Sequence, residues 1–135
     1  MTVGGAYILF VELLESVHVE VGSLGVIQFS PGLYAYVGSA RRGLEARVLR
    51  HLRRDKRTRW HIDYITPHAA RAWATVIPAD NPPECAISQY LFRVAKKVVK
   101  GFGASDCSCP SHMVYLGESS IRRTHNAGTS CSSLP

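Results

Sequence analysis

The first part of the chain has the residue pattern of a β-sheet. Residues 5–14 are apolar at nearly every position, which predicts a strand buried on both faces and therefore central. Valines alternate with polar residues over 17–21, and a second apolar run at 26–29 predicts the return strand of a hairpin. Another strand follows at 32–37, and we expect Gly38-Ser39 to end it. The first forty residues therefore predict antiparallel strands joined by hairpins.

The apolar period becomes helical in two places, 44–54 and 83–99. The first predicted helix buries the stripe Leu44, Val48 and Leu52. The second buries the stripe Ile87, Leu91, Val94 and Val98. Arg47 and His51 are four residues apart on the flank of the first stripe. We expect their polar ends at the lip of a cleft, held in place but still in contact with water.

The rest of the chain adds a short helix or turn at 60–64, a strand at 72–77 and a last strand at 112–116. We predict one domain over 1–117, followed by a polar tail over 118–135. The predicted fold class is α/β (α+β): a compact domain with a small, mostly antiparallel central sheet, flanking helices and an extra N-terminal hairpin.

The charge is positive and uneven. The formal net charge is +6, and nine Lys/Arg but only two acids fall between 41 and 59. A local excess of this size favours a polyanionic partner such as nucleic acid, whereas a solvated basic surface is the alternative. The predicted nucleic-acid-binding residues are Arg41, Arg42, Arg50, Arg53, Arg54, Lys56 and Arg57.

Membrane and secretory classes are not favoured. No apolar run reaches the length of a membrane span, and the N-terminus lacks the regions of a signal peptide, so we expect a cytoplasmic protein with no membrane partner. For that compartment we do not assume disulfides among Cys85, Cys107, Cys109 and Cys131, and a disulfide of the kind found in thermophiles stays open. Cys107 and Cys109 with His112 form a weak zinc-site pattern, which stays open as an alternative.

Five side chains suit phosphodiester chemistry: Tyr7, Tyr36, Arg47, His51 and Glu84. A guanidinium matches a phosphate, and a lone carboxylate can hold Mg²⁺ that keeps several waters. A phenol must be acidified to act as a base at neutral pH, and we expect the arginine, the histidine and a metal to favour the phenolate. Glu84 also fits the start of the second helix as a capping acid, so both roles stay open.

These residues occur in motifs with a family resemblance. Gly5-Ala6-Tyr7 resembles the first half of the GIY-YIG endonuclease signature, and Tyr36-Val37-Gly38 resembles the second half. Arg47, His51 and Glu84 stand where members of that family carry their helix arginine, a histidine and the metal-binding glutamate. Further stretches resemble the small stand-alone Uri-type branch: Tyr-Val-Gly-Ser-Ala, Trp-His-Ile-Asp-Tyr, Glu-Cys and Gly-Phe-Gly-Ala-Ser-Asp-Cys-Ser-Cys-Pro-Ser-His. The resemblance covers about residues 4–116.

The resemblance implies a sheet of about three central strands flanked by helices. It also implies DNA cleavage with one divalent ion, Mg²⁺ or Mn²⁺, and one site per chain. Tyr7 would be the general base, Tyr36 would position water or phosphate, and Arg47 would hold the scissile phosphate. His51 would orient or deprotonate the phenol or the water, and Glu84 would bind the metal. Secondary candidates from the Uri-like stretches and their surroundings are His61, Asp63, Asp106 and His112.

The chain departs from the family pattern in three ways. Ala6 replaces the usual isoleucine, residues 15–30 lengthen the gap between the two half-motifs, and the asparagine that often follows the glutamate helix has no match, since Ser105 and Asp106 occupy that region. The alternative functions are a nucleic-acid-binding module with this fold and little activity, or a structural zinc protein. RNA stays open as a partner beside DNA. Because one site cuts one strand at a time, double-strand cleavage would require a dimer or two successive binding events, and the oligomeric state is left open.

Overall fold

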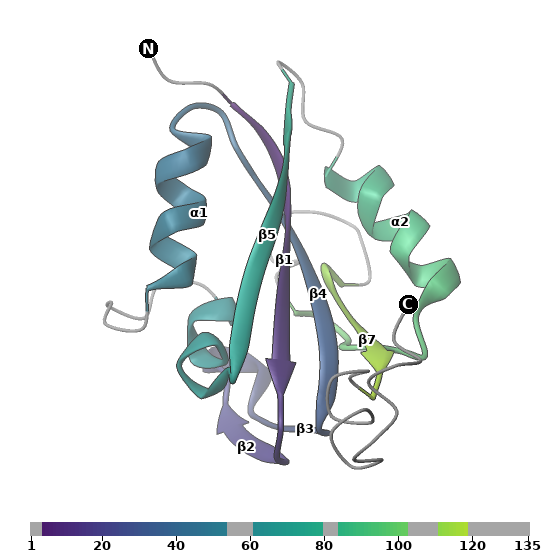
Figure 1. Ribbon diagram of the computed structural model, residues 1–135. Helices are drawn as coiled ribbons and strands as arrows, with labels where there is room; N and C mark the ends of the chain where they lie inside the picture. The colour runs from purple at the N-terminus through teal and green to yellow at the C-terminus, as the bar shows by residue number, and fades with distance from the viewer. Residues whose placement is uncertain (1–3, 54–60, 80–83, 103–110, 119–135) are drawn as a thin grey trace, which may run out of the picture.

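A five-stranded antiparallel sheet forms the middle layer of the protein (Figure 1). The computed structural model describes residues 4–53, 61–79, 84–102 and 111–118. The sheet has the order β5–β1–β4–β7–β6. Its strands are β1 (Gly5–Leu13), β4 (Gly32–Ala40), β5 (Arg71–Pro78), β6 (Lys97–Val98) and β7 (Met113–Gly117). The predicted fold class is confirmed, with the three inner strands β1, β4 and β7 flanked by two edge strands.

β1 is central, as its apolar sequence predicts. It pairs with β4 on one side and with β5 on the other, both antiparallel. Because successive side chains point to opposite faces, Leu9 and Val11 enter one core, whereas Ile8 and Phe10 pack in a second core on the other face. The same register places Tyr7 directly opposite Gly38 of β4.

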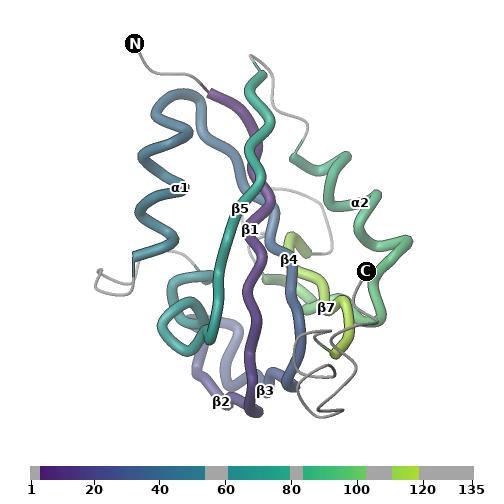
Figure 2. The backbone as a smooth tube through the Cα atoms, in the orientation of Figure 1, coloured from purple at the N-terminus to yellow at the C-terminus, as the bar shows by residue number. Residues whose placement is uncertain are grey.

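Helices cover both faces of the sheet (Figures 1 and 2). α1 (Leu44–Leu52) and the 3₁₀ helices η2 (His61–Tyr64) and η3 (Thr66–His68) pack on the face of the larger core. α2 (Glu84–Val94) packs on the opposite face through Ile87 and Leu91. The result is a three-layer arrangement in which residues of α1 and α2 are separated by the sheet.

The extra N-terminal hairpin is confirmed as a separate two-stranded sheet. It consists of β2 (Val17–Glu20) and β3 (Val26–Phe29), connected across the 3₁₀ helix η1 (Gly22–Leu24). The prediction that each of the first four strands pairs with the next one is therefore wrong. β1 pairs with β4, and the hairpin lies between these two strands only in the sequence. Long apolar β1 and β4 bury more surface against each other than β1 would against the short, half-buried β2.

The second predicted helix is too long. α2 ends at Val94, and Lys97–Val98 forms edge strand β6 against β7. Val94 and Val98 are consequently exposed, although the helical stripe predicted both as buried. After Val94 the backbone can form interstrand hydrogen bonds with the edge of β7. This tertiary pairing overrides the helical period of the apolar residues.

Two details near α1 also differ from the predictions. Gly38-Ser39 does not end the preceding strand, because β4 continues to Ala40 in pairing with β1. α1 ends at Leu52, whose side chain is 37% exposed, whereas His51 is 1% exposed. The helix is rotated so that the imidazole faces the sheet, where its Nε2 contacts the hydroxyl of Tyr7.

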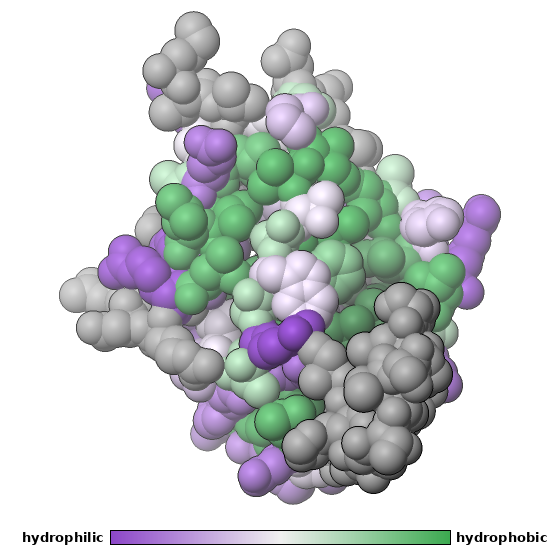
Figure 3. Space-filling model, viewed as in Figure 1, coloured by the Kyte–Doolittle hydropathy of each residue, from purple (hydrophilic) through white to green (hydrophobic). Residues whose placement is uncertain are grey.

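The surface over β5 and α1 is partly apolar (Figure 3). Exposed side chains on these two elements include Leu49, Leu52, Trp73 and Val76. Trp73 stacks on Phe10 with ring centroids 5.5 Å apart, and the Arg71 guanidinium lies 4.8 Å from its ring centroid on the sheet surface. Among the described residues, no helix is long and apolar enough to cross a membrane.

Phe29 is expected to fasten the hairpin to the main core. Its ring is 1% exposed and makes edge contacts with Tyr34 and Phe102, at centroid distances of 5.6 and 6.1 Å. Phe29→Ala should lower the free energy of unfolding by about 3–5 kcal/mol, since it removes a buried ring and leaves a cavity. Urea unfolding measures this.

The control lies on the same strand. Val26 is 70% exposed, so Val26→Ala should cost less than about 1 kcal/mol. Equal losses for the two variants would show that the hairpin does not depend on the Phe29 contacts.

Candidate active site

The candidate site lies where β4 extends beyond the end of β7. The β4–β7 register ends at Tyr36 opposite Met113, and the Val37 N–H still donates to the His112 carbonyl at 2.9 Å. Past this point the described residues include no strand that pairs with this side of β4. Side chains from α1 on one face and α2 on the other can therefore meet around the edge of a single strand.

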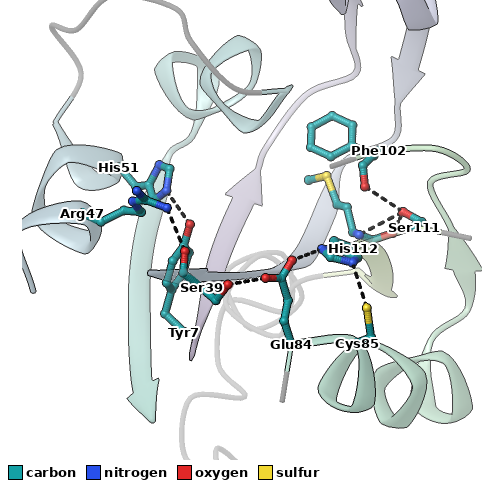
Figure 4. Close-up of polar contacts among 10 residues, drawn as sticks. Tyr7, Ser39, Arg47, His51, Glu84, Cys85, Phe102, Ser111 and His112 are labelled. Atoms are coloured by element: carbon teal, nitrogen blue, oxygen red, sulfur yellow. Dashed lines mark hydrogen bonds and ion pairs between the residues drawn. The ribbon is translucent and has the colours of Figure 1, made fainter. Parts of the chain in front are cut away.

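Ser39 joins the two faces at this edge (Figure 4). The Arg47 Nη1–H of α1 donates to the Ser39 carbonyl at 2.8 Å. The Ser39 hydroxyl donates to Oε1 of Glu84, the first residue of α2. An arginine and a glutamate that are 37 positions apart in sequence are thus held on the same serine.

Tyr7 and His51 form a buried pair beside this edge. The Tyr7 Oη lies 2.7 Å from His51 Nε2, and the two side chains are 2% and 1% exposed. The Tyr36 ring stands 6.4 Å from the Tyr7 ring and 6.3 Å from the imidazole. The prediction of a wet His51 at the lip of a cleft is wrong, because α1 turns this residue onto Tyr7 in the core.

Both phenols are harder to ionise than ordinary tyrosines. Burial raises the pKa of Tyr7 far above its usual value, and Tyr36, Glu84 and Asp63 raise it further. Burial likewise raises the pKa of Tyr36, with Glu84 and Asp63 next. The charge of Arg47 lowers the pKa of both but is outweighed, since desolvation dominates. The expected acidification of the phenol by its cationic neighbours does not occur in the protein alone.

Glu84 has the opposite tendency. Burial acts to raise its pKa, but contacts with His112 and Ser39 and the charges of His112 and Arg47 outweigh burial, and the pKa lies below its ordinary value. His112 Nδ1 lies 2.5 Å from Glu84 Oε2, and the glutamate side chain is 25% exposed. Glu84 therefore presents a carboxylate that is anchored from two sides and remains accessible from solvent.

The secondary candidates lie in different environments. Asp63 is fully buried on η2 and forms an ion pair with Arg50 at 3.1 Å. His61 packs edge-on against Phe102, and burial lowers its pKa. His112 contacts Glu84, as described, whereas Asp106 lies outside the described residues.

The predicted nucleic-acid-binding residues are only partly described. Arg41, Arg42 and Arg53 are exposed around α1. Arg50 instead directs its guanidinium at Asp63. Arg54, Lys56 and Arg57 lie outside the described residues, as do Cys107 and Cys109 of the zinc alternative.

Two site residues were not identified from the sequence. Ser39 is visible there only as part of the stretch Tyr-Val-Gly-Ser-Ala, and its link between Arg47 and Glu84 depends on strand pairing. Cys85 is disulfide-bonded, a possibility that the sequence left open, and its Sγ lies 3.8 Å from His112 Nε2. Sequence separation between cysteines says nothing about the distance between their Cα atoms, which decides whether they can pair.

The Glu84 carboxylate fits a hard divalent ion. Each of its oxygens has one contact and retains a lone pair, and the depressed pKa keeps the group ionised near neutral pH. No group of three or more His, Cys, Asp or Glu within the described ranges is arranged to hold a metal. Mg²⁺ requires no such protein cage, because it commonly combines one or two carboxylates with waters and substrate phosphate.

Residues 6–132 match a family described as Domain of unknown function DUF123. The chain belongs to this family. No curated protein and no solved structure gives a significant match. The matched region of this DUF123 protein includes Tyr7, Tyr36, Arg47 and Glu84, and it continues past residue 117. The boundary between domain and tail at 117/118 stays a prediction, because 119–135 lie outside the described residues.

Gly38 of this DUF123 protein provides the space for the Tyr7 side chain. A Cβ at Gly38 would lie 2.2 Å from Tyr7 Oη and 2.3 Å from its Cζ. Gly38→Ala should therefore lower stability by about 1–3 kcal/mol, as overpacking does, and displace the phenol. Urea unfolding measures the loss.

A double-mutant cycle tests the cause. In a Tyr7→Ala background the same Gly38→Ala change should cost much less, because the overlapping atoms are gone. An equal cost in both backgrounds would place the clash elsewhere.

The anchored Glu84 carboxylate should make stability depend on pH. Its pKa is lower in the folded protein than the reference value of 4.5, so its contribution is present above about pH 4.5 and is lost as pH falls through the folded pKa. The stability difference between wild type and Glu84→Gln should be largest from about pH 5 to 7 and shrink below. Urea unfolding across this range checks it.

Glu45, exposed in the first turn of α1, supplies the matched control. Glu45→Gln should change stability little. A Glu84→Gln difference that stays constant down to about pH 3 would contradict the assignment of an anchored carboxylate.

Proposed function

We propose that this DUF123 protein is a divalent-metal-dependent endonuclease that hydrolyses DNA phosphodiester bonds. The observation that carries the proposal is the meeting of Arg47 and Glu84 at Ser39, beside the buried Tyr7–His51 pair. These residue types, in this arrangement, supply a phosphate ligand, a metal ligand and a proton acceptor. The resemblance of the two half-motifs to the GIY-YIG endonuclease signature, and to its Uri-type branch, supports the same reaction.

Arg47 would hold the scissile phosphate. A guanidinium has five N–H donors in a planar fork, so it can bind the Ser39 carbonyl and a phosphate oxygen together. Its permanent charge would balance the negative charge that grows on phosphorus oxygens during attack. The same charge lowers the pKa of Glu84 and both phenols, which places Arg47 within electrostatic reach of the whole cluster.

Glu84 would bind the divalent ion, Mg²⁺ or Mn²⁺. When bound, such an ion supplies Lewis-acid stabilisation of the leaving oxygen. Ser39 and His112 would keep the carboxylate ionised and aimed at the strand edge. The contacts of Glu84 and Arg47 with Ser39 support this role, because the metal ligand and the phosphate ligand would have to lie close together.

Tyr7 would act as the base without ever being a stable phenolate. Because burial raises its pKa, it remains protonated near neutral pH, and it would donate its proton toward His51 Nε2. As the water oxygen bonds to phosphorus, the water proton would pass to Tyr7 Oη while the phenol proton passes to His51 Nε2. The phosphorus–oxygen bond to the leaving sugar breaks, and the sugar oxygen takes a proton from solvent. Tyr36 would position the water or the phosphate.

The exposed arginines Arg41, Arg42 and Arg53 around α1 would attract the DNA backbone. A cytoplasmic location stays a prediction, whereas RNA as a partner and the oligomeric state stay open. Binding of nucleic acid without cleavage would replace the nuclease proposal by the alternative of a binding module.

Purified protein incubated with supercoiled plasmid, single-stranded DNA and RNA, in Mg²⁺ or Mn²⁺, tests the activity. We expect cleavage of DNA that EDTA abolishes. Tyr7→Phe and Glu84→Gln should each lower the cleavage rate by at least about 100-fold, because one removes the proton acceptor and the other the metal ligand.

Matched controls exclude effects of the substitutions themselves. Tyr90→Phe, at an exposed phenol on α2, and Glu45→Gln should cleave like wild type. Full activity of Tyr7→Phe or Glu84→Gln would refute the site, and failure to cleave any nucleic acid would refute the enzyme.

A further inference from the structure

We propose that Asp63 is a positioning residue that holds His51 in the tautomer protonated at Nδ1, so that Nε2 can take the proton of Tyr7. This inference rests on the proposed function for its consequence in catalysis. Its structural part, the tautomer, can be measured without any activity.

The two ring nitrogens of His51 face different groups. Nε2 lies 2.7 Å from Tyr7 Oη, and Nδ1 lies 3.8 Å from Asp63 Oδ1. All three side chains are buried: the Tyr7 residue is 2% exposed, and the side chains of His51 and Asp63 are 1% and 0% exposed. The imidazole therefore stands between a phenol and a carboxylate, away from bulk water.

The Asp63 carboxylate is held in position by Arg50. Arg50 Nη1 lies 3.2 Å from Oδ1, and Nη2 lies 3.1 Å from Oδ2, a two-point contact. Two-point pairing fixes the plane of the carboxylate as well as its position. The aspartate on η2 is thus fixed relative to α1, which carries both Arg50 and His51.

Electrostatics then selects the tautomer. With the proton on Nδ1, an N–H dipole points toward the carboxylate, whereas the other tautomer would aim a lone pair at it. A separation of 3.8 Å exceeds hydrogen-bond distance, so the selection is by charge rather than by a formed hydrogen bond. In a buried site such an interaction is screened much less than in water.

The same charge would assist proton transfer. Because Tyr7 is buried and its pKa is raised, it can accept a proton from water only if it passes its own proton on. His51 Nε2 is the acceptor in contact, and the imidazolium formed would face the Asp63 carboxylate. The negative charge of Asp63 would stabilise that cation, while the proton count remains balanced along the line from water to Tyr7 to His51.

The alternative is that Asp63 has a purely structural role. In that case the Arg50–Asp63 ion pair only holds η2 against α1, and removing either partner lowers stability without a specific effect on His51. The positioning role predicts instead that Asp63→Asn changes the His51 tautomer and the chemical step, which loss of the ion pair's structural contact alone would not do.

Long-range ¹H–¹⁵N correlation spectra of ¹⁵N-histidine-labelled protein, at a pH where His51 is neutral, test the tautomer. The chain has six histidines, and His51→Gln identifies the signal that disappears. We expect the Nδ1–H tautomer in wild type and at least partial conversion to the Nε2–H tautomer in Asp63→Asn. An Nε2–H tautomer in wild type, or an unchanged tautomer in Asp63→Asn, would overturn the proposal.

Steady-state kinetics of DNA cleavage test whether Asp63 assists the proton transfer. Asp63→Asn should lower kcat by about 10–100-fold with little change in KM for DNA, since the substitution affects proton transfer and not binding. Asp63→Glu should restore part of kcat. Thermal unfolding shows how much stability each of the two Asp63 variants loses. A kcat that follows stability alone across Asp63→Asn and Asp63→Glu would leave only a structural role for the ion pair.

The two proposals fail in different ways. If wild-type protein cleaves no nucleic acid, the proposed function is refuted, and the spectra still decide whether Asp63 sets the tautomer. If the protein cleaves DNA and Asp63→Asn has the wild-type tautomer and kcat, the role of Asp63 is refuted while the nuclease stands.

Discussion

The antiparallel pairing of β1 with β4 is the constraint on which the candidate site depends. Its register sets Tyr7 against Gly38, and only a glycine leaves space there for the phenol. The same pairing carries β4 past the end of β7, and beyond that point no strand in the described part of the chain pairs with this side of β4. Arg47 and Glu84 meet at that edge through Ser39. A shift of one residue would turn Tyr7 to the other face and separate these groups.

The site combines groups that burial affects in opposite ways. Burial raises the pKa of Tyr7 and Tyr36 and keeps both phenols neutral. Glu84 stays ionised because its contacts with His112 and Ser39 outweigh burial. A neutral proton donor and a fixed anion can thus coexist within one cluster. This separation suits a reaction in which a proton is relayed at one point while charge is balanced at another.

Much of the fold followed from short-range pattern. The apolar run of β1, the alternation in the hairpin and the helical start at Leu44 each predicted the element that is found. The errors arose where tertiary contacts competed with local period. The residues predicted to end the second helix form strand β6 instead. The rotation of α1 buries His51, whereas the sequence pattern predicted Leu52 as the buried residue. Neither competing partner is visible in the local sequence.

The sequence by itself determined which residues are available for chemistry: two half-motifs with their tyrosines, an arginine and histidine one helical turn apart, and a glutamate at the start of α2. Only the tertiary structure decided how they are arranged and protonated. It buried the Tyr7–His51 pair, raised the pKa of the phenol that was expected to be acidified, and added Ser39 and Asp63 to the cluster. The reason is physical: residue type sets what a group can donate or accept, whereas desolvation and neighbouring charge, which set its protonation, depend on distances that folding alone creates.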